Sequence, residues 1–329
     1  MAQCGPHSGP NVMNRLVLLF PGQGAQQVGM GRDIASASQA AAAIYARADD
    51  LLGFPLSRLC FEGTPEDLER TDIQQPAIFA TSAALWAAVV ERGGLETEPA
   101  AAAGLSLGEY TALYAAGSFE FEDGLRLVHR RGQLMQQAAL ATPSGMVTLV
   151  GADQSAAQAL CARASDGEVL GPANFNCPGQ IVISGAKVAC DRAVALADEF
   201  GVRAVPLKVA GAFHSPLMAP AAAELAKVLA HTPIQAPRLR VLSNVDADDH
   251  RTPDAIRESL CRQLTGPVRW QSSMERLIAD GFARFVEIGP GRVLSGLMRK
   301  IDRQVKATNV GTADEVERAS AAAVTTLPS

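Results

Sequence analysis

A serine between two glycines is the residue best suited to chemistry in this chain. Gly104-Leu105-Ser106-Leu107-Gly108 reads Gly-x-Ser-x-Gly, after a small apolar run at 99–103 and before a helical stretch at 110–116. Strand, tight turn and helix in that order are typical of a nucleophile elbow. Glycines suit such a turn because a Cβ would clash where backbones approach closely. Ser106 would stand at the helix start, where backbone N–H groups stabilise negative charge. The alternative is an ordinary N-capping serine.

A serine nucleophile needs a base, most often a histidine. The five histidines are His7, His129, His214, His231 and His250. His214 directly follows a predicted strand at 203–209 and precedes a predicted helix at 216–230. It therefore lies at a strand end, as Ser106 does, and is the first candidate. His250 is the second candidate, because Asp246, Asp248 and His250 could imitate the serine, acid, histidine order of an esterase. It lies in an acidic polar loop, where we expect it to be solvated.

Arg131 is an unusual residue on a predicted helix at 120–139 that otherwise shows an apolar face. One interpretation is a surface arginine whose stem lies along the protein while its charge reaches water. The other is a planar guanidinium that pairs with a carboxylate inside a pocket. Spacing alone favours the surface interpretation.

A glycine-rich loop, 22–26, follows the first predicted strand, 15–20. Gly22 and Gly24 are followed by Gln27 where a dinucleotide-binding fingerprint needs a third glycine, and no Gly-Lys-Ser/Thr follows. The loop can still place backbone N–H groups and Gln23 at the carboxyl end of the first strand. Sites form at that edge in open α/β sheets.

Composition limits the classes of function. The 329 residues are 48% hydrophobic and 19% charged with a net charge of −5, which suits a large core and argues against nucleic-acid binding. No apolar run is long enough for a membrane span, and residues 1–14 lack the apolar core of a secretory signal. The six cysteines are scattered, so we expect reduced thiols, no metal site and a cytoplasmic location.

The order of predicted elements indicates an α/β fold with an insertion. Residues 15–142 and 213–310 have the texture of an α/β-hydrolase-like core with a mainly parallel sheet. Residues 143–212 read β-α-β-β-α-β, the ferredoxin-like arrangement, and are predicted to form an inserted subdomain. Gln75-Pro76 is predicted to open a long helix. Residues 1–14 and 311–329 are predicted to be disordered tails.

Several motifs in order then point to one family. They are Phe20-Pro21-Gly22-Gln23-Gly24-Ala25-Gln26, Gly104-Leu105-Ser106-Leu107-Gly108-Glu109-Tyr110, Arg131-Gly132-x-x-Met135-Gln136, Asn174-Phe175-Asn176, Phe213-His214-Ser215-Pro216-Leu217-Met218 and Glu287-Ile288-Gly289-Pro290-Gly291. With them the chain resembles the malonyl-CoA:acyl carrier protein transacylases of bacterial fatty-acid synthesis, from about residue 16 to 310. That family's α/β-hydrolase-like core with a ferredoxin-like insertion agrees with the order of elements.

The resemblance implies a role for each residue at a matching position. Ser106 would be the acylated nucleophile, His214 its base, Gln23 and Leu107 the oxyanion-hole N–H donors, Arg131 the partner of the malonyl carboxylate, and Gln263 the residue whose main-chain carbonyl orients the histidine. Phe213 resembles the bulky residue of malonyl-selective members, which would crowd an α-methyl branch. Leu105 departs from the histidine that many members carry there, and we expect it to change packing and not the chemistry.

The implied activity is transfer of malonyl from malonyl-CoA to the phosphopantetheine thiol of acyl carrier protein, with no cofactor and as a monomer. Carrier docking would need a local basic patch on this acidic chain, with Arg292, Arg299, Lys300 and Arg303, or Lys187, as candidates. A trans-acting malonyl acyltransferase for a polyketide synthase shares the same chemistry. A serine esterase or thioesterase on the same core, and a non-catalytic carrier-binding subunit, are the rival functions.

Overall fold

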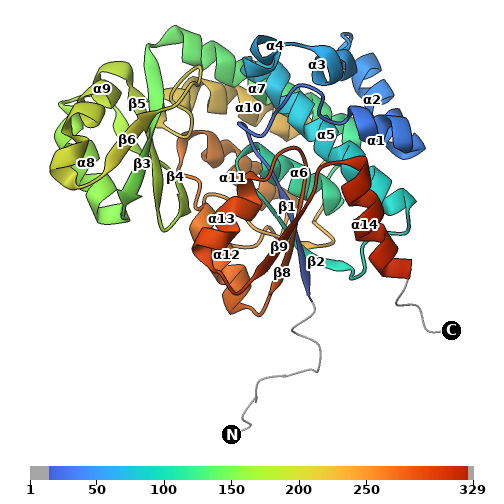
Figure 1. Ribbon diagram of the computed structural model, residues 1–329. Coiled ribbons are helices and arrows are strands. Elements are labelled where there is room, and N and C mark those ends of the chain that lie inside the picture. Colours follow the sequence, from blue (N-terminus) through green and yellow to red (C-terminus); the bar gives the residue numbers. More distant parts are fainter. Residues whose placement is uncertain (1–14, 325–329) are drawn as a thin grey trace, which may run out of the picture.

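The computed structural model describes residues 15–324, which form a larger α/β part and a smaller part beside it (Figure 1). The larger part is built from both ends of the chain. The smaller part is a single stretch between α7 (Phe121–Ala141) and α10 (Ala219–His231). The predicted fold class, an α/β core with an inserted subdomain, is confirmed.

A five-stranded sheet forms the centre of the larger part. Its spatial order is β7 (Arg240–Val241), β2 (Pro99–Gly104), β1 (Leu16–Phe20), β8 (Arg284–Ile288) and β9 (Lys306–Val310), and all neighbouring strands run parallel. A parallel sheet is normally covered by helices on both faces, which explains why β1 is apolar and buried at every position.

Alternate residues of β1 pack into two different clusters. Leu18 and Phe20 belong to the larger cluster, while Val17 and Leu19 belong to the second. Helices α2 (Gln39–Leu52), α5 (Thr71–Glu91), α6 (Leu107–Ala115) and α7 contribute to the first, and α12 (Trp270–Ala279) and α13 (Val293–Ile301) to the second. The remaining helices of this part are α1 (Arg32–Ala37), α3 (Leu56–Glu62), α4 (Pro65–Glu69), α11 (Pro253–Thr265) and α14 (Ala313–Val324).

The inserted part carries a four-stranded antiparallel sheet in the order β4 (Leu170–Cys177), β5 (Gly179–Ala186), β3 (Ser144–Ala152) and β6 (Arg203–Pro206). Helices α8 (Gln154–Ser165) and α9 (Lys187–Leu196) pack against it. This is the ferredoxin-like topology that the element order predicts. The two parts are hydrogen-bonded, because Phe175 N donates to Val268 O at 2.9 Å and Val268 N to Ala173 O at 2.8 Å.

The prediction of disorder at 311–329 is wrong for most of that stretch. Residues 313–324 form α14, which packs against α5, and Val316 is fully buried in the larger cluster. Glu315 accepts a hydrogen bond from Gly311 N at 2.8 Å at the helix start. Alanine-rich sequence resembles low complexity but has high helix propensity, and an apolar contact is enough to order it. Residues 1–14 and 325–329 lie outside the described residues.

The long helix α5 starts at Thr71, earlier than Gln75-Pro76 predicted, so Pro76 lies inside it. Proline there removes one backbone hydrogen bond, and the surrounding burial compensates for that loss. The helix is long and apolar enough to cross a membrane, but 78% of its apolar window is buried inside the protein. It is therefore the central core helix of this fold.

Candidate active site

Ser106 occupies the sharp turn between β2 and α6 that its motif predicts. Its backbone has φ 54° and ψ −102°, a positive φ that is uncommon outside glycine, and it is the N-cap residue of α6. A Cβ on Gly108 would lie 2.0 Å from the Phe20 carbonyl oxygen, so only glycine lets the helix approach β1 this closely. The turn places the serine side chain at the carboxyl end of the parallel sheet.

His214 is hydrogen-bonded to the serine, with 2.8 Å between Ser106 Oγ and His214 Nε2. It lies just before the 3-10 helix η3 (Pro216–Met218), and Ser215 caps that helix while donating to Ala212 O at 2.7 Å. On the other side of the ring, His214 Nδ1 lies 2.7 Å from the main-chain oxygen of Gln263. A carbonyl can only accept, so Nδ1 carries the proton and Nε2 is free to receive one from Ser106.

Burial, with the positive charge of Arg131 as a second cause, lowers the pKa of His214 to about 4, although the hydrogen bond to Gln263 acts in the opposite direction. The imidazole is therefore neutral near pH 7. Ser106 and His214 are 5% and 6% exposed, so both reacting groups are shielded from bulk water.

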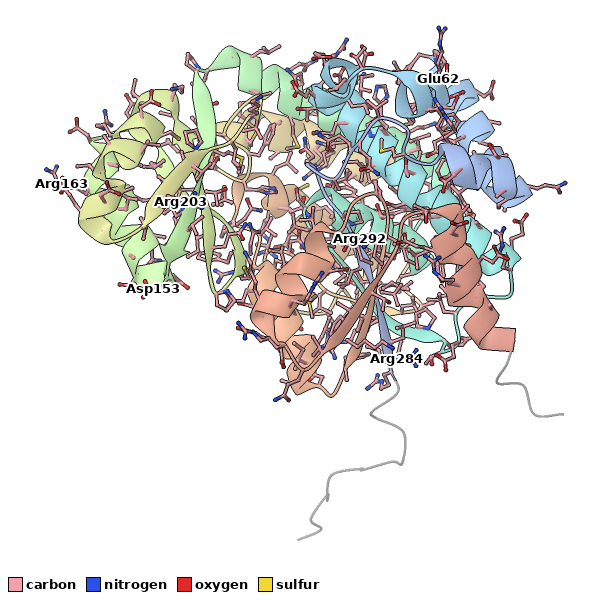
Figure 2. The ribbon with its side chains drawn as sticks, viewed as in Figure 1. Glu62, Asp153, Arg163, Arg203, Arg284 and Arg292 are labelled. Atoms are coloured by element: carbon pink, nitrogen blue, oxygen red, sulfur yellow. The ribbon has the colours of Figure 1, made fainter. Side chains whose placement is uncertain are left out.

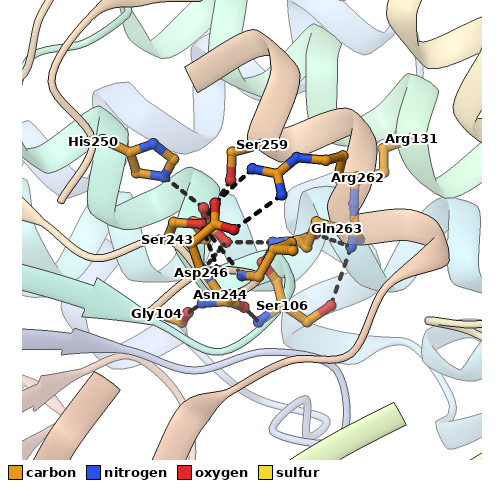
Figure 3. Close-up of polar contacts among 12 residues, drawn as sticks. Gly104, Ser106, Arg131, Ser243, Asn244, Asp246, His250, Ser259, Arg262 and Gln263 are labelled. Carbon is orange, nitrogen blue, oxygen red and sulfur yellow. Dashed lines mark hydrogen bonds and ion pairs between the residues drawn. The ribbon is translucent and has the colours of Figure 1, made fainter. Parts of the chain in front are cut away.

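Arg131 on α7 is fully buried, which contradicts the surface interpretation favoured by spacing. Its NH1 donates to Gln75 Oε1 at 2.8 Å. Its NH2 donates to Gln263 Oε1 at 2.8 Å and to Ser106 Oγ at 3.1 Å (Figure 3). These hydrogen-bond partners are neutral. A guanidinium held beside the nucleophile by neutral groups can still pair with a carboxylate on the acyl group.

The loop at 22–26 lies directly on the nucleophile turn. A Cβ on Gly22 would sit 2.3 Å from the Leu105 carbonyl oxygen, and Gln23 lines the same cavity as Ser106. Leu107 is the first residue of α6, where a backbone N–H has no acceptor within its helix. This placement suits the predicted oxyanion role of Gln23 and Leu107, which remains a prediction.

A cavity of about 510 Å³ opens onto Ser106 where the two parts of the protein meet. The core contributes Gln23, Ser106 and Val293 to its wall, and the inserted sheet contributes Met146 and Val182. Lys208, Phe213 and His214 also line the cavity. Phe213 is 5% exposed and lines the cavity next to His214, and its predicted role in limiting the size of the acyl group stays a prediction.

His250, the second candidate for the base, is hydrogen-bonded to Glu109 and not to Ser106 Oγ, and it is buried rather than solvated. It is 5% exposed, and its Nε2 lies 2.6 Å from Glu109 Oε1. Asp246 pairs with Arg262 and Asp248 with Arg276. The esterase-like order of serine, acid and histidine is therefore not assembled here, because tertiary contacts direct each of these side chains elsewhere.

Three site residues were missed from the sequence. Gln75, noted only as part of a helix start, holds Arg131, while Glu109 and Asn244 lie beneath the nucleophile turn. Glu109 follows the second glycine of the serine motif, and Asn244 lies in a polar loop after β7. The burial of these polar residues could not be predicted from the residues next to them in the sequence.

Among residues 15–321, where side chains are described, no group of three or more histidine, cysteine or acidic side chains is arranged to hold a metal ion. Cys60, Cys161, Cys177, Cys190 and Cys261 are free thiols.

The fold and the site together define a serine acyltransferase: a serine at a strand-to-helix turn faces a cavity, a histidine is hydrogen-bonded to it, and a buried arginine donates to its hydroxyl. The acyl transferase domain family matches residues 17–324. The chain is 42% identical over 309 residues to the malonyl CoA-acyl carrier protein transacylase of Bacillus subtilis, covering 93% of this chain and 96% of that one. It is 42% identical over 290 residues to the Escherichia coli K12 transacylase, covering 88% and 93%. The chain belongs to the malonyl CoA-acyl carrier protein transacylase family.

Solved structures agree with this assignment. An acyl carrier protein S-malonyltransferase from Vibrio cholerae superposes with a TM-score of 0.89 at 42% identity, covering 92% of this chain and 99% of that one. A malonyl-transacylase in complex with the acyl-carrier protein of a type II polyketide synthase superposes with a TM-score of 0.90 at 39% identity, covering 93% and 99%.

Proposed function

We infer that this chain transfers the malonyl group from malonyl-CoA to the phosphopantetheine thiol of acyl carrier protein, through a malonyl ester on Ser106. One observation carries the proposal: Ser106 Oγ contacts both the base His214 and the buried Arg131. The first contact activates the nucleophile. The second places a positive charge within reach of an acyl group that carries a carboxylate.

In the first half-reaction, His214 Nε2 accepts the Ser106 proton as Oγ attacks the thioester carbonyl. The resulting oxyanion accepts hydrogen bonds from the N–H groups of Gln23 and Leu107, a type of donor whose loss typically lowers rates about 10²–10³-fold. The carbon–sulfur bond then breaks, and CoA leaves with a proton returned by the imidazolium. In the second half-reaction, the carrier thiol gives its proton to His214 and its sulfur attacks the ester carbonyl of malonyl-Ser106. The bond between Oγ and the acyl carbon then breaks, and the imidazolium returns the proton to Ser106. The kinetics should be ping-pong.

Arg131 accounts for a preference for malonyl over acetyl. With malonyl bound, the carboxylate pairs with a guanidinium that is already desolvated by burial. With acetyl bound, the guanidinium keeps only its neutral hydrogen-bond partners, and a buried charge that is not directly paired is unfavourable by several kcal/mol.

Carrier docking is assigned to the exposed end of α13. Of the basic candidates, Arg292 is paired with Glu315 at 2.7 Å, and Lys187 with Asp191 at 2.5 Å. Arg299, Lys300 and Arg303 are exposed, and Lys300 Nζ donates to Gln180, which lines the cavity. An acidic carrier bound there would present its phosphopantetheine arm at the cavity mouth.

The carrier can belong to fatty-acid or polyketide synthesis, because the chemistry at Ser106 is the same for both. We expect the enzyme to act as a monomer in the cytoplasm. A thioesterase function is not favoured, because no acidic side chain orients His214 and the buried Arg131 would have no role in it.

Intact-protein mass spectrometry after brief mixing with malonyl-CoA tests the proposal. We expect a malonyl adduct on the wild-type chain, no adduct on Ser106→Ala, and discharge of the adduct when holo acyl carrier protein is added. Accumulation of free malonate without transfer would indicate a hydrolase. No adduct and no turnover would indicate a non-catalytic carrier-binding subunit.

A further inference from the structure

The side chain of Asn244 is hydrogen-bonded to the backbone of the nucleophile turn at two points. Its Oδ1 accepts a hydrogen bond from Ser106 N at 2.6 Å, and its Nδ2 donates to Gly104 O at 2.7 Å (Figure 3). Asn244 is 2% exposed and comes from the loop after β7, far from Ser106 in the sequence. One amide thus fixes the backbone from Gly104 to Ser106, and the positive φ of Ser106 is otherwise unfavourable.

Asn244 is in turn held by Glu109 on α6. Glu109 Oε2 accepts hydrogen bonds from Asn244 N at 3.1 Å and from Gln263 Nε2 at 2.6 Å. Gln263 Nε2 also donates to Ser106 O at 3.0 Å. The fully buried carboxyl group of Glu109 therefore joins the loop that holds the nucleophile to the residue whose carbonyl orients His214.

We propose that Asn244 is a positioning residue that keeps the Ser106 turn in its reactive conformation, and that Glu109 fixes Asn244 in place. Asn244 acts on the backbone of the turn, Glu109 acts through Asn244, and neither contacts the acyl group. The geometry requires an acceptor facing Ser106 N–H and a donor facing Gly104 O. An asparagine amide supplies both, whereas an ionised aspartate of the same shape supplies only acceptors.

Asn244→Asp tests this requirement because its outcome depends on pH. The introduced carboxyl group would be buried, would face the Gly104 carbonyl oxygen and would lie near Glu109, whose other oxygen faces His250. Each of these features favours the protonated form. When protonated, the group can donate to Gly104 O and accept from Ser106 N–H. When ionised, it repels the carbonyl and the turn loses its clamp.

The rate of Ser106 acylation by malonyl-CoA is measured from pH 5.5 to 8.5 on the full chain. The wild type should be nearly flat, because the pKa of His214 is about 4. Asn244→Asp should be most active at the acid end and fall steadily as pH rises. Asn244→Ala should be slower at every pH by about 10²-fold, with malonyl and acetyl affected equally and KM little changed, as expected for a misplaced reactive group.

Asn309→Asp is the matched control, since Asn309 Nδ2 also donates to a backbone carbonyl, that of Gly291, at 2.8 Å. Asn309 lies in β9, which β1 and β8 separate from β2 in the sheet. It should keep the wild-type shape of the profile. A wild-type profile for Asn244→Asp, or a wild-type rate for Asn244→Ala, would overturn the proposal. If the aspartate variant does not fold, the alanine variant alone decides.

The inference rests on the proposed function, so a second acyl donor is used to test the role of Asn244 separately from the malonyl transfer. Acetylation of Ser106 by p-nitrophenyl acetate, followed by mass spectrometry, needs no malonyl recognition. If malonyl-CoA leaves the wild type unmodified, the proposed function fails, while the same pH comparison with the activated ester still tests Asn244.

Discussion

His214 Nδ1 is hydrogen-bonded to the main-chain oxygen of Gln263 at 2.7 Å, where a serine hydrolase would place a carboxylate. A carbonyl fixes the tautomer but adds no full negative charge, so it stabilises an imidazolium less than an aspartate would. Burial, together with the nearby guanidinium of Arg131, therefore keeps the pKa of His214 low.

This relationship predicts the pH dependence of the first half-reaction. The active form has neutral His214, so kcat/KM for malonyl-CoA should rise with pH through about 4 and then stay flat to pH 8. Stopped-flow acylation at constant ionic strength would show it. An inflection near the ordinary histidine value of about 6.5 would mean that His214 is more solvated than the structure shows.

Arg131 should control acyl selectivity. Arg131→Ala removes the partner of the malonyl carboxylate and should lower malonyl transfer by at least about 10²-fold, as loss of a buried charge pair does, while acetyl transfer falls less or improves. The ratio of acetyl to malonyl adducts on Ser106 measures the change. Arg130→Ala is the matched control, because this neighbour on α7 is half-buried and hydrogen-bonded to Gln133, away from the nucleophile. An unchanged ratio for Arg131→Ala would contradict this role.

Phe213 should limit branching at the α-carbon of the acyl group. Phe213→Ser makes room beside His214, so acylation by methylmalonyl-CoA should rise about tenfold relative to malonyl-CoA, within the range that one methyl group commands in an apolar pocket. Competition between the two thioesters, read by mass spectrometry, gives the ratio. If methylmalonyl stays excluded, another wall of the cavity sets the limit.

Carrier docking can be tested by charge reversal. Lys300→Glu should raise KM for acyl carrier protein severalfold and leave KM for malonyl-CoA unchanged, because a charge at the rim of an interface acts mainly on encounter. Arg163→Glu is the control, since Arg163 lies at the outer end of the inserted part in Figure 2. Equal effects of the two variants would show that only net charge matters.

The order of the C-terminal segment can be tested by stability. Val316→Asp would bury a carboxyl group in the cluster beneath α14 and should lower the free energy of unfolding by about 3 kcal/mol, as an uncompensated buried charge does. Arg318→Asp places the same residue on the exposed side of the helix and should have little effect. Thermal unfolding of both variants gives the comparison. A wild-type midpoint for Val316→Asp would mean that α14 does not contribute to stability.

Local sequence was enough to predict the elements that carry the nucleophile. A buried apolar strand, two glycines around Ser106 and a following helix are short-range features, and together they are typical of this strand-to-helix turn. The alternation of helices and strands similarly predicted a parallel core with an antiparallel insertion, because parallel strands need long crossovers.

Tertiary structure decided which polar residues surround Ser106. Arg131 looked like a surface residue because spacing along one helix cannot show that α5 and α11 cover its polar side with Gln75 and Gln263. For the same reason Glu109 and Asn244 were not singled out and His250 was expected to be solvated. The segment of α14 was predicted to be disordered because its ordering depends on α5. Sequence patterns report the periodicity of one element, whereas burial of a charge depends on what other elements place around it.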